Sequence, residues 1–290
     1  MHIIRPMVKL IETRLNSTIL LKEVADCTGY SERWLYNRFR TLTGITVAQY
    51  IRRRKLTLAA VLLRHSSRPV TDIAIMYGFS SLQSFSRAFY NHYRMYPSAY
   101  RRADEWDLSY AQPVLFLSAN SPKVSFIRTG CGSGKITLDK KMPVKLNIDF
   151  NNAFNQNEQL IYDNNLHQAV MSVFNQTREM KSFIIAGELI PGNKTDSCLK
   201  YQITAPVTPE DITKLLPDGT YAHLSFSGSY EQIAAFQMYE SYSALSKCRC
   251  KIRRGAMYTL FQRRHSAETA AIRFIIPCVD DGRSRLWKND

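Results

Sequence analysis

The sequence predicts a multidomain chain: an all-α N-terminal domain with two helix-turn-helix units, followed by an α+β domain with duplicated β-α-β-β sets. Three observations predict this fold class. The first hundred residues show helical periodicity with an internal repeat, strand and helix patterns alternate from Val144 onward, and the excess positive charge lies in the first third. A chain of 290 residues with 45% hydrophobic content can bury the cores of about two domains. We expect domains at residues 1–105 and 123–290, joined by a connector at residues 106–122.

A short repeat marks the two helix-turn-helix units. The segment EVADCTGYS at residues 23–31 returns as DIAIMYGFS at residues 72–80. In each copy a short amphipathic helix is expected to end at Gly29 or Gly78, because glycine adopts the left-handed conformation that other residues resist. Ser31 and Ser80 are expected to cap the helix that follows, since a serine hydroxyl accepts a hydrogen bond from a free amide of the first turn.

The second helix of each unit has a polar face opposite an apolar stripe when its residues are placed at 100° steps. The first stripe is Leu35, Phe39 and Leu42, with Arg33, Asn37 and Arg40 opposite. The second stripe is Leu82, Phe85 and Phe89, with Gln83, Arg87, Tyr90 and Arg94 opposite. Arginine can bond guanine in a bidentate way, and Asn or Gln can bond adenine. One such face is typical of a solvated helix, but two at matched positions indicate DNA reading. The candidate DNA contacts are Arg33, Trp34, Asn37, Arg40, Gln83, Ser84, Arg87 and Arg94.

One long helix at residues 45–66 is expected to join the two units. Its apolar stripe is Val47, Tyr50, Ile51, Leu58, Val61 and Leu62. Such a helix can hold two DNA-reading helices for successive major-groove segments about 34 Å apart.

The positive charge is concentrated in the first third of the chain. Residues 1–102 contain 17 Lys and Arg against 5 Asp and Glu, whereas the remainder contains 22 against 19. A basic, folded surface suits a polyanion. The run Arg52–Lys55 can touch phosphates or form a solvated helix face.

The second unit resembles the AraC/XylS family of bacterial regulators. Residues 72–102, DIAIMYGFSSLQSFSRAFYNHYRMYPSAYRR, follow the family's spaced pattern of IA, GF, S, F, SR, F, P and YR, within a similarity over about residues 5–102. The resemblance implies a monomer that binds a bipartite promoter site in double-stranded DNA, bends it slightly and recruits or positions RNA polymerase. A DNA-binding domain at the start of the chain resembles the family's Rob, or right origin-binding, type. This resemblance implies a cytoplasmic, nucleoid-associated bacterial activator. Arg33 and Asn37 stand where resistance-type relatives usually have Trp and Arg, so an altered DNA site is expected.

The C-terminal part reads as two sets of strand, helix, strand, strand. The first set is residues 144–150, 165–180, 182–190 and 198–207; the second is 219–228, 230–245, 255–264 and 270–279. Before them, Pro113 and Pro122 bound a short strand candidate, PVLFLS. GSGK at residues 132–135 reads as a glycine-rich turn, because Thr129 and Ile136 depart from the phosphate-loop motif.

This part is similar to the GyrI-like ligand-binding domains, with the clearest match in GTYAHLSFSGSYEQI and RFIIPCV. The resemblance implies a cleft for bulky, often aromatic effectors, with a Glu of the last strand facing the ligand. Arg273 takes that position here, and an Arg pairs with an anion, so an anionic effector is expected. The alternative is that Arg273 pairs with a protein acid such as Glu188 and leaves the cleft without a ligand. The candidate ligand residues are Tyr221, Phe226, Tyr230, Tyr258 and Arg273.

Catalytic and metal motifs are absent from the sequence. The six His are isolated and HExxH and GxSxG do not occur. Apart from the Cys248/Cys250 pair, none of the six Cys has the close spacing of a metal or redox motif. Cys248 and Cys250 lie among cations that can lower a thiol pKa. We therefore expect no enzyme, cofactor, metal or membrane segment; Tyr230 and Glu231 form the one polar pair considered for hydrolysis.

The sequence predicts a sequence-specific transcription regulator. Two helices would contact the DNA bases, and the C-terminal domain would sense an effector. Two alternatives stay open. One is a weakly specific architectural DNA-binding protein, which would show a steep salt dependence with little sequence preference. The other is a small-molecule-binding or hydrolysing module tethered to DNA.

Overall fold

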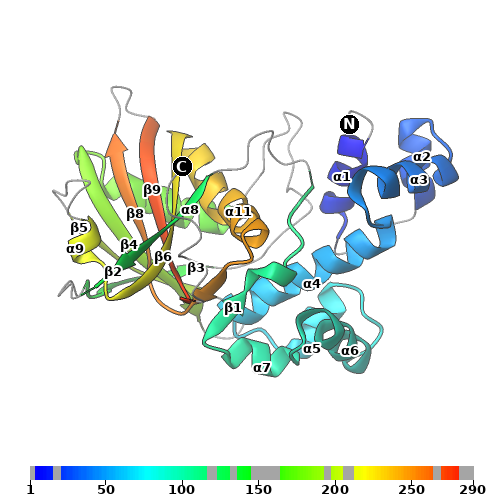
Figure 1. The fold of residues 1–290 in the computed structure, drawn as a ribbon, viewed down its shortest axis with the longest axis horizontal. Helices are drawn as coiled ribbons and strands as arrows, with labels where there is room; N and C mark the ends of the chain where they lie inside the picture. Colours follow the sequence, from blue (N-terminus) through cyan, green and yellow to red (C-terminus); the bar gives the residue numbers. More distant parts are fainter. Residues whose placement is uncertain are drawn as a thin grey trace.

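The structure is a computed structural model that describes residues 4–15, 21–115, 123–130, 136–144, 164–192, 197–204, 212–263 and 269–280. Helices come first and an antiparallel sheet with further helices follows (Figure 1). This order confirms the predicted helical N-terminal part and a sheet-rich C-terminal part. Within the described residues, no helix is long and apolar enough to cross a membrane.

The helical part consists of two units on either side of one long helix. The first unit contains α1 (Ile4–Thr13), α2 (Leu21–Thr28) and α3 (Glu32–Thr43). The long helix α4 (Val47–His65) follows, and then α5 (Val70–Met76), α6 (Leu82–Tyr93) and α7 (Pro97–Arg102). The predicted helix at residues 45–66 is therefore confirmed. A capping box begins it, because the Thr46 hydroxyl accepts from Gln49 N and the Gln49 side chain accepts from Thr46 N.

The turns of both units have the predicted backbone shape. Gly29 and Gly78 each have φ +71°, the left-handed conformation. Ser31 caps α3 as predicted, since its hydroxyl accepts from Trp34 N at 3.3 Å. The predicted cap Ser80 is wrong: Ser81 caps α6 and accepts from Ser84 N at 3.1 Å. The reason is that the second turn is one residue longer than the first between its glycine and its helix.

The apolar stripes of α3 and α6 are confirmed in their centres but not at their ends. Phe39 and Phe85 are fully buried, as are their stripe partners Leu35 and Phe89. Leu42 and Leu82, in contrast, are 37% and 43% exposed. Leu82 is the first residue of α6 and Leu42 lies in the last turn of α3. Each therefore lies at an end of its helix, beyond the residues that pack on the core.

Nine strands, counted over the described residues, form one antiparallel sheet. They are β1 (Glu105–Asp107), β2 (Val124–Thr129), β3 (Lys140–Val144), β4 (Ser182–Pro191), β5 (Ser197–Thr204), β6 (Gly219–Ser229), β7 (Lys251–Arg253), β8 (Met257–Arg263) and β9 (Thr269–Cys278). Their order is β1-β7-β9-β8-β4-β5-β3, and β6 pairs with both β9 and β2. The helices of this part are α8 (Asn164–Gln176), α9 (Ile212–Leu215), α10 (Tyr230–Ala235), a π-helical turn (Phe236–Glu240) and α11 (Ser241–Lys247).

The connector differs from its prediction. Residues 105–107 form β1, which pairs with β7 through Trp106 and Ile252, and a 3-10 turn follows at Leu108–Tyr110. Residues 113–115 of the predicted strand PVLFLS are not in a strand, and its remainder lies outside the described residues. The GSGK segment and most of the strand predicted at residues 144–150 also lie outside them.

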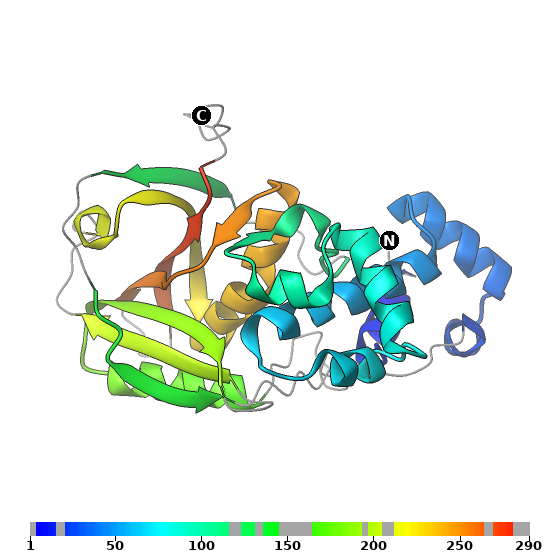
Figure 2. The ribbon, with the colours of Figure 1, turned by 90° about the horizontal axis from the view of Figure 1, so that it is seen from below.

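The helical part and the sheet meet at the C-terminal end of α4 (Figures 1 and 2). The ring of His65 lies with Nδ1 3.4 Å from the Leu189 carbonyl oxygen in β4. Ser67 donates to the Gly192 carbonyl at 2.9 Å, and the Ser197 hydroxyl donates to the His65 carbonyl. The helix that lies between the two units thus also docks on the β4–β5 pair.

Candidate nucleic-acid interface

The α3 helix presents its predicted polar face to solvent. Arg33, Trp34, Asn37 and Arg40 are all exposed, because the opposite stripe of Leu35 and Phe39 is buried against the core. The Trp34 ring stacks on Tyr30, with ring centroids 4.2 Å apart. Tyr30 was not among the predicted DNA contacts. Its position directly after the turn glycine Gly29 is the feature of the sequence that could have indicated it.

The α6 helix presents Gln83 and Arg87 to solvent in the same way. Ser84 is half-buried and its hydroxyl belongs to the capping box, since it accepts from Ser81 N at 3.2 Å and donates to the Ser81 carbonyl at 2.8 Å. Arg94 is exposed but is not a helical residue. It is the C-cap of α6 with φ 58°, so its direction cannot be taken from the helical periodicity of α6.

The arginines on these surfaces are available for a polyanion. Over the described part of the chain, Arg33, Arg40, Arg87 and Arg94 take part in no ion pair, whereas the ion pairs that do occur involve other cations. A second exposed aromatic pair, Tyr90 and Tyr96, stacks with centroids 4.7 Å apart beside them. Unpaired guanidinium groups with exposed polar and aromatic neighbours can contact phosphates and base edges.

The scaffold that holds both faces is fixed by a buried polar cluster. Arg54 of α4 donates from Nε and Nη2 to the Glu12 carboxylate of α1 at 2.9 Å each, and from Nη1 to the Gln112 carbonyl at 2.8 Å. Tyr50 donates to the same carboxylate at 2.6 Å. Burial raises the pKa of the Tyr50 hydroxyl, and the charge of Glu12 raises it further. Burial lowers the pKa of Arg54, but the charge of Glu12, its hydrogen bond and the nearby tyrosines together outweigh burial, so the pKa is raised.

This cluster corrects the prediction for the run Arg52–Lys55. Arg52 is exposed, but Arg54 is 5% exposed and ion-paired, so it neither touches phosphate nor lies on a solvated face. The physical reason is its position four residues from both Tyr50 and Leu58, on the stripe of α4 that faces the core.

The five predicted ligand residues do not surround one cleft. The register aligns Tyr258 with Ile275 and Ser225 with Arg273, which places Tyr221, Tyr258 and Arg273 on one face of the sheet. Phe226 lies opposite Ile272 and therefore on the other face, where its ring stacks on Phe236 at 4.6 Å. Tyr221 and Phe226 are an odd number of residues apart on one strand, so the prediction that both line the same cleft is wrong.

The remaining residues of that prediction have other neighbours. Tyr230 stacks on Phe174 with centroids 4.8 Å apart and accepts a hydrogen bond from Arg263, which places it in the packing of α8 and α10. Arg273 forms no ion pair with Glu188 among the described residues, so the pairing suggested with Glu188 is wrong as well. The side chain of Glu231 lies outside the described ones.

The cysteines whose side chains the structure describes are buried or half-buried. Burial raises the pKa of the Cys248 thiol, and the charge of Lys247 lowers it by less. The net rise fits an ordinary cysteine at a helix end rather than an activated thiol. Cys250 and Cys278 are both buried, with their Sγ atoms 3.0 Å apart. Within the described residues, no group of three His, Cys, Asp or Glu side chains is arranged to hold a metal ion.

Comparison with known proteins finds relatives for the N-terminal part of the chain. The Helix-turn-helix domain family matches residues 24–103. The chain is 40% identical over 115 residues to the transcriptional regulator Rob of Salmonella typhimurium, which is 40% of each chain. It is 41% identical over 100 residues to the regulatory protein SoxS of the same organism, 34% of this chain and 94% of SoxS. It is 41% identical over 106 residues to the transposon Tn10 TetD protein of Escherichia coli, 37% of this chain and 77% of TetD.

The similarity to Rob covers less than half the length of that protein, whereas the similarity to SoxS covers nearly all of it. The matched residues 24–103 contain most of α2 and all of α3 to α7, which carry both exposed polar faces and the long helix between them. With its matched pair of helix-turn-helix units, this chain belongs to the AraC/XylS family of helix-turn-helix transcription regulators.

Proposed function

We propose that the protein is a sequence-specific DNA-binding transcription regulator, an activator that acts with RNA polymerase and carries a C-terminal effector-sensing domain. One observation carries the proposal: α4 connects two helix-turn-helix units, each of which presents an exposed polar helix face. A helix of 19 residues is about 28 Å long. That length suits two reading helices on one side of a duplex, in successive major-groove segments.

The base-reading residues of this proposal are Arg33, Asn37 and Arg40 on α3, and Gln83 and Arg87 on α6. Trp34, Ser84 and Arg94 lie next to them and are proposed to contact sugar and phosphate. The protein would bind a bipartite promoter site as a monomer, because the chain itself supplies both readers. Relatives named as a transcriptional regulator and as a regulatory protein support this role.

The C-terminal part is proposed as a GyrI-like regulatory domain at residues 123–290, after a DNA-binding domain at residues 1–105. The described elements occur in the orders β3-α8-β4-β5 and β6-α10-α11-β7-β8-β9; apart from α11 and the three-residue strand β7, this supports two related sets. The helices α10 and α11 pack with β6 and β9 around a common core that includes Phe236, Leu245 and Phe274.

The first test is selection of bound sequences from a random DNA pool at about 150 mM salt, followed by affinity for the selected site and a scrambled control. The expected result is a bipartite site with half-sites about one helical turn apart and roughly thousandfold preference. Absence of an enriched sequence would contradict the proposal and favour weakly specific, architectural binding.

The Arg87→Ala variant tests the reading role of α6. We expect it to lose about 1–3 kcal/mol on the selected site and to relax preference at one base position, as for a base-reading arginine. Arg178→Ala is the matched control, because Arg178 is an exposed arginine beyond α8. Equal weakening on selected and scrambled DNA would instead assign Arg87 to a phosphate contact.

A further inference from the structure

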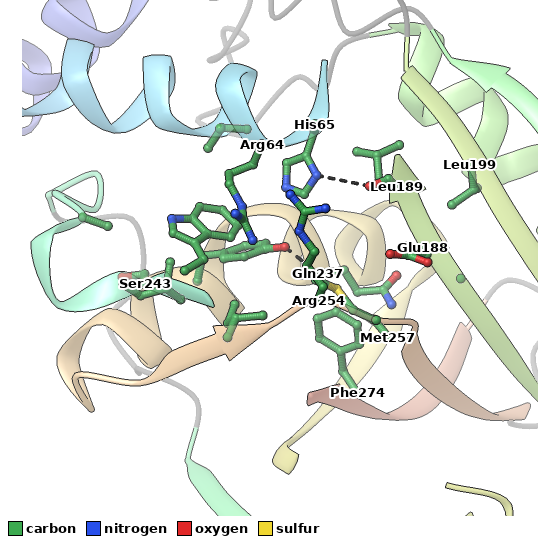
Figure 3. A pocket seen from close by; sticks show the side chains of 18 of the residues that line it. Arg64, His65, Glu188, Leu189, Leu199, Gln237, Ser243, Arg254, Met257 and Phe274 are labelled. Atoms are coloured by element: carbon green, nitrogen blue, oxygen red, sulfur yellow. Dashed lines mark hydrogen bonds between the residues drawn. The ribbon is translucent and has the colours of Figure 1, made fainter. Parts of the chain in front are cut away.

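A cavity of about 380 Å³ lies where the helical part meets the sheet. Its walls come from α4, the connector, α8, the β4–β5 pair, the helical segment from the π-helical turn through α11, and β7 to β9 (Figure 3). Tyr221, Phe226, Tyr230, Tyr258 and Arg273 are not among its described lining residues. This cavity is therefore a different place from the cleft that the sequence predicted.

Most of the cavity wall is apolar. Its apolar lining includes Leu58 and Val61 of α4, Trp106 of β1, Leu189 of β4 and Phe274 of β9. Trp106 is held by an edge contact to the His65 ring, with centroids 5.6 Å apart. A largely apolar cavity of a few hundred cubic ångströms with a few polar groups is typical of a small-molecule site.

The polar part of the wall carries a net positive charge. Arg64 and Arg254 share the Ala103 carbonyl as a hydrogen-bond acceptor, Arg64 also donates to the Tyr100 carbonyl at 3.2 Å, and Arg254 donates to the Arg101 carbonyl at 3.0 Å. These acceptors are carbonyl dipoles and do not neutralise the guanidinium charges. Asp104 lies 3.7 Å from Arg254 but is 92% exposed, so its charge is screened.

The other charged groups do not reverse this balance. Arg54 is already paired with Glu12. Burial lowers the pKa of His65 to about 4, so its ring is neutral at pH 7. Glu188 is the one carboxylate among the described lining residues, against Arg64, Arg101, Arg253 and Arg254. Figure 3 shows Arg64 and Arg254 beside His65, with Glu188 on the strand that carries Leu189.

We infer that this cavity binds one amphipathic organic anion, with its apolar body against α4 and β9 and its acid group at Arg64 and Arg254. An anionic group there gains charge-assisted hydrogen bonds from two neighbouring cations, of which Arg64 is half-buried and Arg254 is exposed at the cavity mouth. The inference rests on the proposed function in one respect, because it names the class of effector that the C-terminal domain senses. The bound molecule would touch α4 directly, the helix that lies between the two DNA-reading units.

The test is a fluorescence titration of the full chain with 8-anilinonaphthalene-1-sulfonate and with N-phenyl-1-naphthylamine, which has the same rings without the sulfonate. We expect one saturable sulfonate site per chain and at least tenfold weaker binding of the uncharged amine. Val61→Trp should weaken sulfonate binding at least tenfold, because the indole fills the cavity. Arg254→Gln should reduce the ratio between the affinities for the sulfonate and for the uncharged amine. Arg178→Gln, at an exposed arginine outside the cavity, should change neither titration.

Two results would overturn the inference: equal binding of the two probes by the unmodified chain, or unchanged sulfonate binding in the filled cavity. Leu199→Trp fills the same cavity from β5, so it decides the matter if Val61→Trp disturbs α4. DNA binding is measured without probe in every variant. A chain that selects no DNA sequence but shows these probe differences would refute the proposed function and leave the ligand site intact.

Discussion

Arg54 shows how one side chain fixes the relation between α1, α4 and the connector. Its guanidinium group contacts Glu12 in α1 and the Gln112 carbonyl beyond β1. Replacing it with Met should destabilise the helical part by about 3–5 kcal/mol, because the Glu12 carboxylate is left buried without a partner. Urea unfolding followed by circular dichroism measures the change, and Arg52→Met is the control because Arg52 is exposed in the same helix.

A double replacement separates the lost pair from the lost packing. Glu12→Leu together with Arg54→Met removes both charges, so it should be clearly more stable than Arg54→Met alone. Equal instability of the single and the double variant would show that the pair itself does not explain the effect.

His65 makes the junction between α4 and β4 sensitive to acid. Burial lowers its pKa from 6.5 to about 4, and the Leu189 carbonyl opposes this to a smaller extent. Below pH 6.5 the unfolded chain takes up a proton that the folded chain resists, so stability falls as the pH drops from 6.5 to 4. A difference of 2.5 pKa units corresponds to roughly 3 kcal/mol over that window.

The His65→Phe variant should lack this part of the pH dependence. Burial also lowers the pKa of His92 and His223, but these residues are present in both proteins and cancel in the comparison. Thermal unfolding at several pH values between 7 and 4 gives the difference. Parallel curves for the two proteins would mean that His65 titrates normally in the fold.

Exposed and buried arginines were only partly separable from the sequence. The exposed faces of α3 and α6 followed from helical periodicity, and the structure has Arg33, Asn37, Gln83 and Arg87 in solvent. Arg54 was misplaced although a signal existed, because Tyr50, Arg54 and Leu58 recur every four residues on one stripe. Its partner Glu12 is distant in sequence, and no local pattern identifies it.

At the scale of elements, the left-handed turns are the features that the sequence located best. Gly29→Ala should cost about 1–2 kcal/mol, because a Cβ is disfavoured at φ +71° while no atom lies within 4 Å of it. Gly130→Ala is the matched control, since its Cβ also meets nothing within 4 Å and its φ is not in the left-handed region. Equal destabilisation by the two changes would show that backbone strain is not the cause.

The strands were easier to find than to pair. Short apolar runs bounded by turn residues located β4, β6, β8 and β9 closely. The pairing of β1 with β7 was not predicted, since β1 has three residues and its partner lies more than a hundred residues later. The misassigned cleft was avoidable, because the odd spacing between Tyr221 and Phe226 already places them on opposite faces of a strand.

At the scale of the whole molecule, the cavity and the DNA-reading faces share α4 as a wall and a scaffold. The cavity is lined by Leu58, Val61 and Arg64 of α4, and the same helix packs against both reading units. If ligand and DNA each favour one placement of α4, the ligand changes DNA affinity and DNA changes ligand affinity by the same factor. Coupling of this kind is typically worth about 1–3 kcal/mol, which is roughly a 5- to 150-fold effect.

We therefore expect saturating 8-anilinonaphthalene-1-sulfonate to change the affinity for the selected DNA site, and that DNA to change the affinity for the probe equally. Anisotropy with labelled DNA measures the first factor, and a probe titration with saturating DNA measures the second. Val61→Trp should bring both factors to one, because the probe no longer reaches α4. If neither affinity changes in the unmodified chain, α4 does not couple the cavity to the DNA-reading helices α3 and α6. Unequal factors would show that the probe also binds elsewhere, since a single linked pair of sites must give reciprocal changes.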